Sequence, residues 1–203
     1  HIEVLKLEEF GPSLFIDGEL QVAEKDEKKY SGQFVGSALN LSKNNSSAAI
    51  IGGGDGGVAR ELSSKGFDLI DWYELDPEVV KVCQKHLLKV CGDIKANNKV
   101  KTYWGDAFES IKKVKDSKYD KIFVDLNDDQ FCIDLAARNM KGLKRILKPG
   151  GVITAQVGCM SKKPRQVKNW LELLKSNFGN AVLDEVFIPS FDCRWNFASS
   201  SHK

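Results

Sequence analysis

The segment SAAIIGGGDGGVARELSSKGFDLIDWYELDPEVV, residues 47–80, contains the pattern that decides the fold. The apolar run at 48–52 predicts a strand, 56–65 predicts a helix, and 67–75 predicts a second strand. Gly52, Gly54 and Gly57 have the spacing G-x-G-x-x-G between the first strand and the helix, and Glu74 follows Gly54 by twenty residues. Such glycines let a ligand approach the backbone closely, and an acid at this distance suits a ribose diol. The segment therefore predicts a site for an adenosine-containing ligand.

An aspartate, Asp55, interrupts the glycines of this turn. A dinucleotide would place its pyrophosphate here, at the start of the helix, where the carboxylate would repel it at short range. The carboxylate of intact S-adenosylmethionine would meet the same repulsion in milder form. Asp55 therefore predicts an adenosyl ligand with a cationic end, and it argues against an NAD-dependent enzyme.

The rest of the chain repeats the strand–helix order of this segment. Short apolar runs at 2–7 and 11–24 predict strands, Asp17-Gly18 inside the second segment is a strong hairpin signal, and 26–41 predicts a helix. From residue 48 to 178 strands alternate with helices, and 181–190 with 193–199 are expected to close the sheet as antiparallel strands. We predict an α/β fold with a doubly wound, mostly parallel Rossmann-like sheet of the class I methyltransferase type and a small N-terminal antiparallel β unit. Two domains are expected: a β-hairpin subdomain at 1–30, truncated upstream, and a Rossmann-like domain at 31–203.

Acidic residues follow the predicted parallel strands. They are Asp76 after the second strand, Asp106 after the third, and Asp125, Asp128 and Asp129 after the fourth. Asp76 is equally explained as a helix N-cap, and Asp106 also fits the N-cap of the next helix, although this position commonly reaches an adenine amino group in such folds. Because ligands bind at the carboxyl ends of such strands, we expect these acids to line a negative cleft. In a chain of net charge +2, such a cleft predicts a polycationic ligand.

The amino-acid composition excludes several other classes of protein. The chain has 203 residues, 42% of them hydrophobic, which suits one globular unit. It has no basic stripe interleaved with aromatic residues, no apolar run long enough to span a membrane and no visible signal peptide, so nucleic-acid and membrane partners are not expected. Its five cysteines contain no CxxC pair. We therefore expect free thiols, no metal site and a reducing, cytoplasmic location.

Several motifs together resemble one family. GGGDGGVARE (52–61), ELDPEVV (74–80), GDAFESI (105–111) and YDKIFVDLNDD (119–129) are similar to successive motifs of the aminopropyltransferases, the spermidine and spermine synthases. DGELQVAEKDEKKY (17–30) resembles that family's hairpin and tyrosine-bearing segment. KVCGDI (89–94) and IPSFDCRWNF (188–197) resemble the spermine synthase branch most closely.

This resemblance implies an aminopropyltransferase of polyamine biosynthesis. Decarboxylated S-adenosylmethionine would be the co-substrate, a polyamine the acceptor and methylthioadenosine the product, with no metal required. The implied donor site consists of Gly52, Gly54, Asp55 for the aminopropyl ammonium, Gly57, Glu74 for the ribose, Asp76 near the nucleoside and Asp106 for the adenine amine. The implied catalytic residues are Asp125 as base and Tyr30 at the junction of donor and acceptor. The implied acceptor site consists of Gln21, Tyr30, Asp128, Asp192 and Trp195.

Features of both the spermidine and the spermine synthase branches are present, so the resemblance does not decide which amine is the acceptor. Ser31 after Tyr30 matches the spermine branch, whereas Asp128 matches the spermidine branch, and Cys193 stands where the spermine branch has an acid. We expect spermidine as the favoured acceptor, putrescine as the next, and a homodimer in the full-length protein. The loop after Asp128 is short compared with the family's substrate-covering loop. The alternatives are a methyltransferase that uses intact S-adenosylmethionine and a catalytically degenerate homologue that acts as a scaffold.

Overall fold

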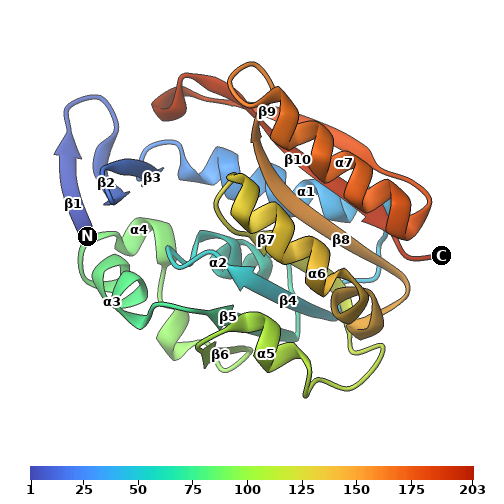
Figure 1. Ribbon diagram of the computed structural model, residues 1–203. Coiled ribbons are helices and arrows are strands. Elements are labelled where there is room, and N and C mark those ends of the chain that lie inside the picture. The colour runs from blue at the N-terminus through green and yellow to red at the C-terminus, as the bar shows by residue number, and fades with distance from the viewer.

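The computed structural model describes residues 1–203, apart from the side chain at position 95. Two sheets form its framework (Figure 1). The smaller sheet is antiparallel and contains β1 (Ile2–Leu7), β2 (Gly11–Ile16) and β3 (Glu19–Ala23) in that order. The larger sheet has seven strands in the order β6-β5-β4-β7-β8-β10-β9. This arrangement confirms the predicted α/β class and the small N-terminal β unit.

The predicted hairpin forms at Asp17-Gly18. Both residues have positive φ, 51° and 82°, and the neighbouring Ile16 and Glu19 are paired across β2 and β3. Positive φ at both turn positions matches the right-handed twist of the strands, which is why Asp-Gly is favoured there. The expected domain boundary at residue 30 falls inside helix α1 (Glu27–Leu41), and the division into two domains stays a prediction.

Four neighbouring strands make the parallel centre of the larger sheet. They are β6 (Val100–Trp104), β5 (Leu69–Glu74), β4 (Ser47–Gly52) and β7 (Tyr119–Asp125), and β8 (Leu147–Cys159) continues the parallel order beside β7. β10 (Cys193–Ser201) runs antiparallel to both β8 and β9 (Val182–Ile188). The strand order therefore reverses between β4 and β7, and such a switch point opens a crevice at the carboxyl ends of the strands.

Helices cover both faces of the larger sheet, as doubly wound folds require. Besides α1, they are α2 (Gly57–Ser64), α3 (Pro77–His86), α4 (Leu88–Cys91), α5 (Ala107–Ile111), α6 (Gln130–Ile146) and α7 (Pro164–Phe178). One core includes residues of α5, α6 and α7, and the other includes residues of α1, α2 and α4. On α6 the buried residues Ile133, Ala136, Met140 and Leu143 recur at helical spacing, so one stripe faces the sheet. Among the described residues, no helix combines the length and apolarity needed to cross a membrane.

The smaller sheet is attached to the larger unit through its own apolar cluster. Leu14 and Val22 from this sheet pack with Val79, Cys83 and Leu87 near α3 and α4. Between α3 and α4 the helix is interrupted at Leu87, which leaves helical geometry, with φ −128° and ψ 43°, and is completely buried. The interruption lets the helical segment turn beneath the small sheet.

The prediction of five free thiols is wrong in this structure. Cys159 at the end of β8 and Cys193 at the start of β10 form a disulfide with a Cα–Cα distance of 6.3 Å. The pairing joins adjacent antiparallel strands, since Cys159 lies opposite Trp195. A sequence separation of 34 residues hides this proximity from a search for short cysteine motifs. Cys83, Cys91 and Cys132 are free.

Candidate functional site

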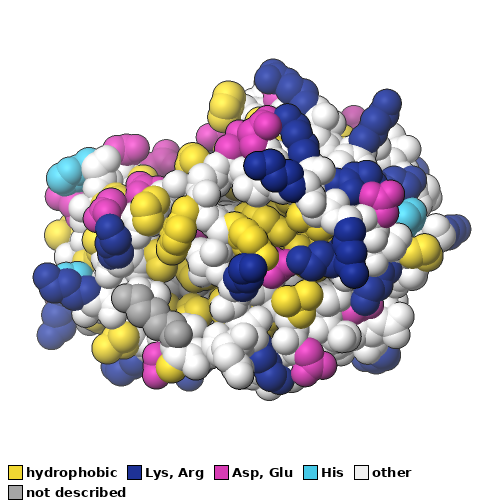
Figure 2. Space-filling view, turned by 90° about the horizontal axis from the view of Figure 1, so that it is seen from below, with side chains coloured by type: hydrophobic (Ala, Val, Ile, Leu, Met, Phe, Trp, Pro, Cys, Tyr) yellow, Lys and Arg dark blue, Asp and Glu magenta, His cyan; other side chains and the backbone are white. Residues whose placement is uncertain are grey.

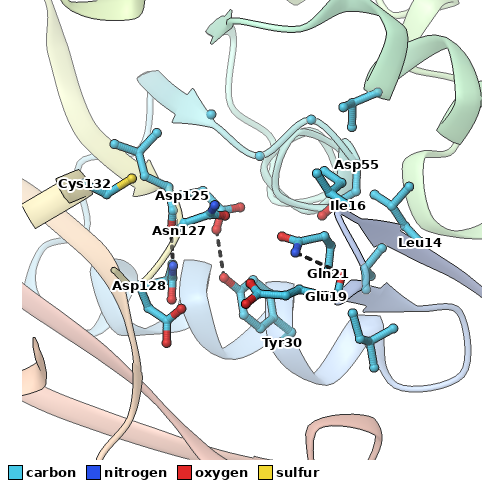
Figure 3. A pocket seen from close by; sticks show the side chains of 18 of the residues that line it. Leu14, Ile16, Glu19, Gln21, Tyr30, Asp55, Asp125, Asn127, Asp128 and Cys132 are labelled. Carbon is cyan, nitrogen blue, oxygen red and sulfur yellow. Dashed lines mark hydrogen bonds between the residues drawn. The ribbon is translucent and has the colours of Figure 1, made fainter. Parts of the chain in front are cut away.

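A cavity of about 930 Å³ lies where the carboxyl ends of β4, β5 and β7 approach the small sheet. Figure 3 shows side chains from the small sheet, from α1 and from the end of β7 converging on it. On the face in Figure 2, hydrophobic side chains gather near the centre, while Lys and Arg side chains are dispersed around them. The cavity is therefore at the crevice that the strand order predicts.

The glycine turn forms one wall of this cavity. Gly52 has φ +83°, and the backbone of Asp125 lies so close to it that a Cβ would collide with the Asp125 carbonyl oxygen. The amide of Gly53 donates to that oxygen over 3.0 Å. At Gly54 a Cβ would lie 2.8 Å from Val79 Cγ1 and 3.1 Å from Glu74 Oε2. Glycine is thus required for the turn to lie against both neighbouring strand ends.

Asp55 points its carboxylate back to the start of α2. Its Oδ1 accepts a hydrogen bond of 2.6 Å from the amide of Gly57, a residue that does not itself line the cavity. Burial raises the pKa of Asp55 well above its usual value, and the charges of Asp125 and Glu27 raise it further. No Lys or Arg of the described chain forms an ion pair with Asp55. A bound cation would relieve this repulsion.

Three further residues of the predicted donor-substrate site lie at or just after the strand ends. Glu74 is almost fully buried and accepts from the amide of Asp76 over 2.9 Å, and burial raises its pKa. Asp76 caps α3 through the amide of Glu78, and Asp106 caps α5 through the amide of Phe108 over 2.7 Å. Asp76 and Asp106 also line the cavity. Each therefore has a structural role as a cap, and its position at the cavity leaves the predicted ligand role open.

Asp125 and Tyr30 both line the cavity and contact each other. The Tyr30 hydroxyl donates to Asp125 Oδ1 over 2.8 Å, as the dashed line in Figure 3 marks. Burial raises the pKa of Asp125 to about 7, the hydrogen bond from Tyr30 opposes that rise, and the charges of Glu74 and Glu27 add to it. Burial and the Asp125 charge raise the pKa of Tyr30 well above its usual value. The pair thus combines a neutral phenol with a carboxylate that titrates near neutral pH, as a general base requires.

The predicted acceptor residues divide into two groups. Gln21, Asp128 and Trp195 line the cavity. Asp192 does not: it is exposed in a left-handed conformation, with φ +46°, directly after the 3₁₀ turn Pro189–Phe191. Asp192 therefore does not line the cavity in this structure, and its predicted role in the acceptor site stays a prediction.

Aromatic side chains form the wall beside Tyr30. Phe191 and Trp195 lie with ring centroids 6.4 Å from that of Tyr30 and 4.7 Å from each other. The Trp195 indole donates to Gln156 Oε1 over 3.1 Å, and the Gln156 amide donates to the carbonyl of Leu126. Sequence reasoning missed Phe191 and Gln156. Their contacts depend on the β8–β10 pairing, which no local motif indicates.

Glu27 was also missed, although its spacing offered a signal. It stands three residues before Tyr30 on α1, so both side chains share one helix face. Glu27 is 2% exposed and pairs with Arg60 of α2 over 2.6 Å. Arg60 also donates to Ser31 Oγ over 2.9 Å and to the carbonyl of Val90. These contacts, called here the Arg60 clamp, hold α1, α2 and α4 together around the glycine turn at residues 52–57.

The lining of the cavity is strongly acidic. Its carboxylates are Glu19, Asp26, Glu27, Asp55, Glu74, Asp76, Asp106, Asp125 and Asp128, whereas its cationic side chains are Lys162 and Lys163. Asp55, Glu74 and Asp125 have no ion-pair partner among the described residues, so the cavity is a negative cleft. Of the acids expected there, Asp129 does not line the cavity: it is exposed and caps α6 by accepting from the amide of Cys132. Within the described part, no group of three or more His, Cys, Asp or Glu side chains is arranged to hold a metal ion.

Known proteins resemble this chain in sequence and in fold. A family model described as the spermine/spermidine synthase domain matches residues 27–203. A polyamine aminopropyltransferase of Prochlorococcus marinus (strain MIT 9215) is 33% identical over 211 residues, covering 99% of this chain and 73% of the relative. Polyamine aminopropyltransferase 2 of Aquifex aeolicus (strain VF5) is 32% identical over 184 residues, covering 88% of this chain and 37% of the relative.

Two solved structures have the same fold. A crystal structure of spermidine synthase in complex with the transition state analogue AdoDATO matches with a TM-score of 0.92 and 21% identity, over 100% of this chain and 70% of that chain. Spermidine synthase from Thermotoga maritima matches with a TM-score of 0.87 and 21% identity, over 100% and 68% of the two chains. At this identity the two structures support the fold alone. The family model and the sequence relatives, which span nearly all of the chain, establish that the protein belongs to the spermine/spermidine synthase family of aminopropyltransferases.

Proposed function

We propose that the protein transfers the aminopropyl group of decarboxylated S-adenosylmethionine to an amine of a polyamine and releases methylthioadenosine. The observation that carries this proposal is the group of three carboxylates, Asp55, Glu74 and Asp125, which line one cavity without ion-pair partners in the described chain. Their mutual repulsion favours a ligand with positive charge. The names of the sequence relatives and the AdoDATO complex of a spermidine synthase support the same chemistry.

The donor would lie across the glycine turn. Glu74 would accept hydrogen bonds from the ribose diol, and Asp106, which uses Oδ1 for its cap, would receive the adenine amine with its other oxygen. Asp55 would bind the aminopropyl ammonium. A donor that keeps the methionine carboxylate would place it near the same buried acids, so decarboxylation converts an unfavourable charge contact into a favourable one.

Transfer would then require one proton acceptor. The acceptor nitrogen attacks the carbon next to sulfur, the new C–N bond forms as the C–S bond breaks, and the sulfur leaves as a neutral thioether. An alkylammonium has a pKa near 10.4 and must lose a proton before it attacks. Asp125 takes that proton, and the Tyr30 hydroxyl orients its carboxylate. Holding both substrates in one cleft lowers the entropic part of the barrier.

For the acceptor, spermidine is proposed first and putrescine second, on the basis of Ser31 and of the motifs that resemble the spermine branch. Asp128 at the cavity supports a second ammonium on the acceptor. The position of Asp192 outside the cavity removes one expected anchor. The homodimer and the cytoplasmic location stay predictions.

The decisive experiment incubates the purified protein with decarboxylated S-adenosylmethionine and a panel of diamines and triamines, with mass spectrometry of the products. We expect an amine enlarged by one aminopropyl group and an equal amount of methylthioadenosine. Asp125→Asn should abolish transfer and retain donor binding, because the amide keeps the shape of the carboxylate but takes no proton. Thermal stabilisation by S-adenosylhomocysteine, without any by methylthioadenosine, would instead favour a methyltransferase. Donor binding without product would favour a scaffold.

A further inference from the structure

We propose that Lys163 determines acceptor selectivity by competing with the acceptor's second ammonium for Asp128. This inference rests on the proposed function. Lys163 Nζ lies 3.0 Å from Asp128 Oδ1 at the cavity wall. A lysine side chain ends in the same alkylammonium group that a polyamine offers, so the two bind a carboxylate by the same interaction. The chain thus carries its own tethered analogue of the acceptor terminus.

The Asp128 carboxylate is more deeply buried than the Lys163 ammonium. Asp128 packs against Gly158 of β8, where φ is +83° and a Cβ would lie 3.0 Å from the Asp128 Cβ. Its side chain is 17% exposed, and that of Lys163 is 40% exposed. The Lys163 ammonium has Asp128 as its one hydrogen-bond partner among the described residues. A partly exposed ion pair of this kind contributes little stability, so a ligand can displace the ammonium.

The backbone holds Lys163 at this place. The amides of Lys162 and Lys163 both donate to the carbonyl of Cys159, over 3.1 and 2.7 Å, and α7 begins at the next residue, Pro164. Lys162 points elsewhere, because its Nζ donates to the carbonyl of Phe191 over 2.8 Å. Lys163 is therefore the lysine at this wall that neutralises a carboxylate of the cavity.

The consequence depends on the number of charges in the acceptor. A diamine or triamine must place one nitrogen beside Asp125 and can bind a second at Asp128, but only after it displaces Lys163. A monoamine has no second ammonium and gains nothing from Asp128. Lys163 therefore weakens the binding of polyamines but not that of monoamines. It reduces the difference in affinity between polyamines and monoamines of similar length.

The test compares Lys163→Met with the wild type, using a diamine, a triamine and a primary monoamine of matched carbon length as acceptors. Methionine keeps the packing of the alkyl chain and removes the charge. We expect the KM for both polyamines to fall about five-fold, the scale of a partly exposed ion pair, with kcat, the donor KM and the monoamine KM unchanged. In an Asp128→Asn background, Lys163→Met should have no further effect on KM.

Lys168→Met is the matched control, since this exposed lysine of α7 lies outside the cavity lining. It removes the same charge from the same region and should leave all constants unchanged. An unchanged polyamine KM in Lys163→Met, or an equal change for the monoamine, would overturn the inference while wild-type turnover preserves the proposed function. If Lys163→Met fails to fold, Lys163→Gln provides the same charge removal. Absence of transfer by the wild type with every amine would overturn the proposed function itself.

Discussion

Replacing Asp125 by asparagine should stabilise the empty protein as well as stop transfer. The pKa of this carboxyl rises from 3.8 to about 7 in the fold, chiefly because burial disfavours the charged form. Between these two values the folded state binds more protons than the unfolded state. The free energy of unfolding therefore falls as pH rises from about 4 to about 7, and the loss is complete above that range. Asparagine removes the charge and hence the loss.

The size of the effect follows from the same pKa values. A difference of about 3 pH units corresponds to roughly 4 kcal/mol above pH 8, an upper limit because Asp55 and Glu74 titrate with Asp125. At pH 5 the loss is smaller, on the order of 1–2 kcal/mol, because the unfolded carboxyl is only partly further ionised than at its own pKa. For a chain of this length, 4 kcal/mol would raise Tm by roughly 10 °C.

Thermal unfolding of the wild type and of Asp125→Asn at pH 5 and pH 8.5 measures this difference. Asp128→Asn is the matched control: it makes the same chemical change three residues away, but it breaks the pair with Lys163 and should lower Tm slightly. If Asp125→Asn does not raise Tm at pH 8.5, or raises it equally at both pH values, the electrostatic account of the site is refuted.

Three further predictions concern other parts of the molecule. Lys121→Met should stabilise the protein by up to about 3 kcal/mol at pH 7 and by little above pH 10, because the buried Lys121 ammonium has no hydrogen-bond partner among the described residues and its pKa falls to about 8. Chemical denaturation at the two pH values measures this difference. Tyr30→Phe removes the hydrogen bond that stabilises the ionised Asp125, and should move the acidic limb of the kcat/KM profile upward by about 1–2 pH units, whereas Tyr103→Phe should not. Cys193→Ser should cost about 4 kcal/mol, measured by denaturation without reductant, and almost nothing with reductant.

Short sequence motifs correctly predicted those parts of the fold whose conformation depends on residues close together in the chain. Asp17-Gly18 formed the expected turn, because few other residue pairs tolerate positive φ at both positions. The glycine turn and Glu74 likewise lie together, because the strand–turn–helix unit places them at adjacent strand ends. These features depend on stretches of about thirty residues. The sequence of such a stretch contains most of the information about its structure.

Features that depend on distant contacts were not predictable in this way. The disulfide between Cys159 and Cys193 requires the register of β8 against β10, and the ion pair between Asp128 and Lys163 joins residues 35 positions apart. Asp192 was placed in the acceptor site by its position in a motif, yet it does not line the cavity in the folded chain. In each case, tertiary pairing decides where a side chain points.

The Arg60 clamp makes three segments of the chain dependent on one another. A guanidinium can bind Glu27, Ser31 and the Val90 carbonyl at once, whereas a lysine ammonium lacks the planar fork for that geometry. A change at any one of these side chains would leave a buried group without its partner. We therefore expect positions 27, 31 and 60 to vary together during evolution. An alignment of many relatives would then show correlated substitutions between helix α1, which carries Tyr30, and helix α2, which follows the glycine turn.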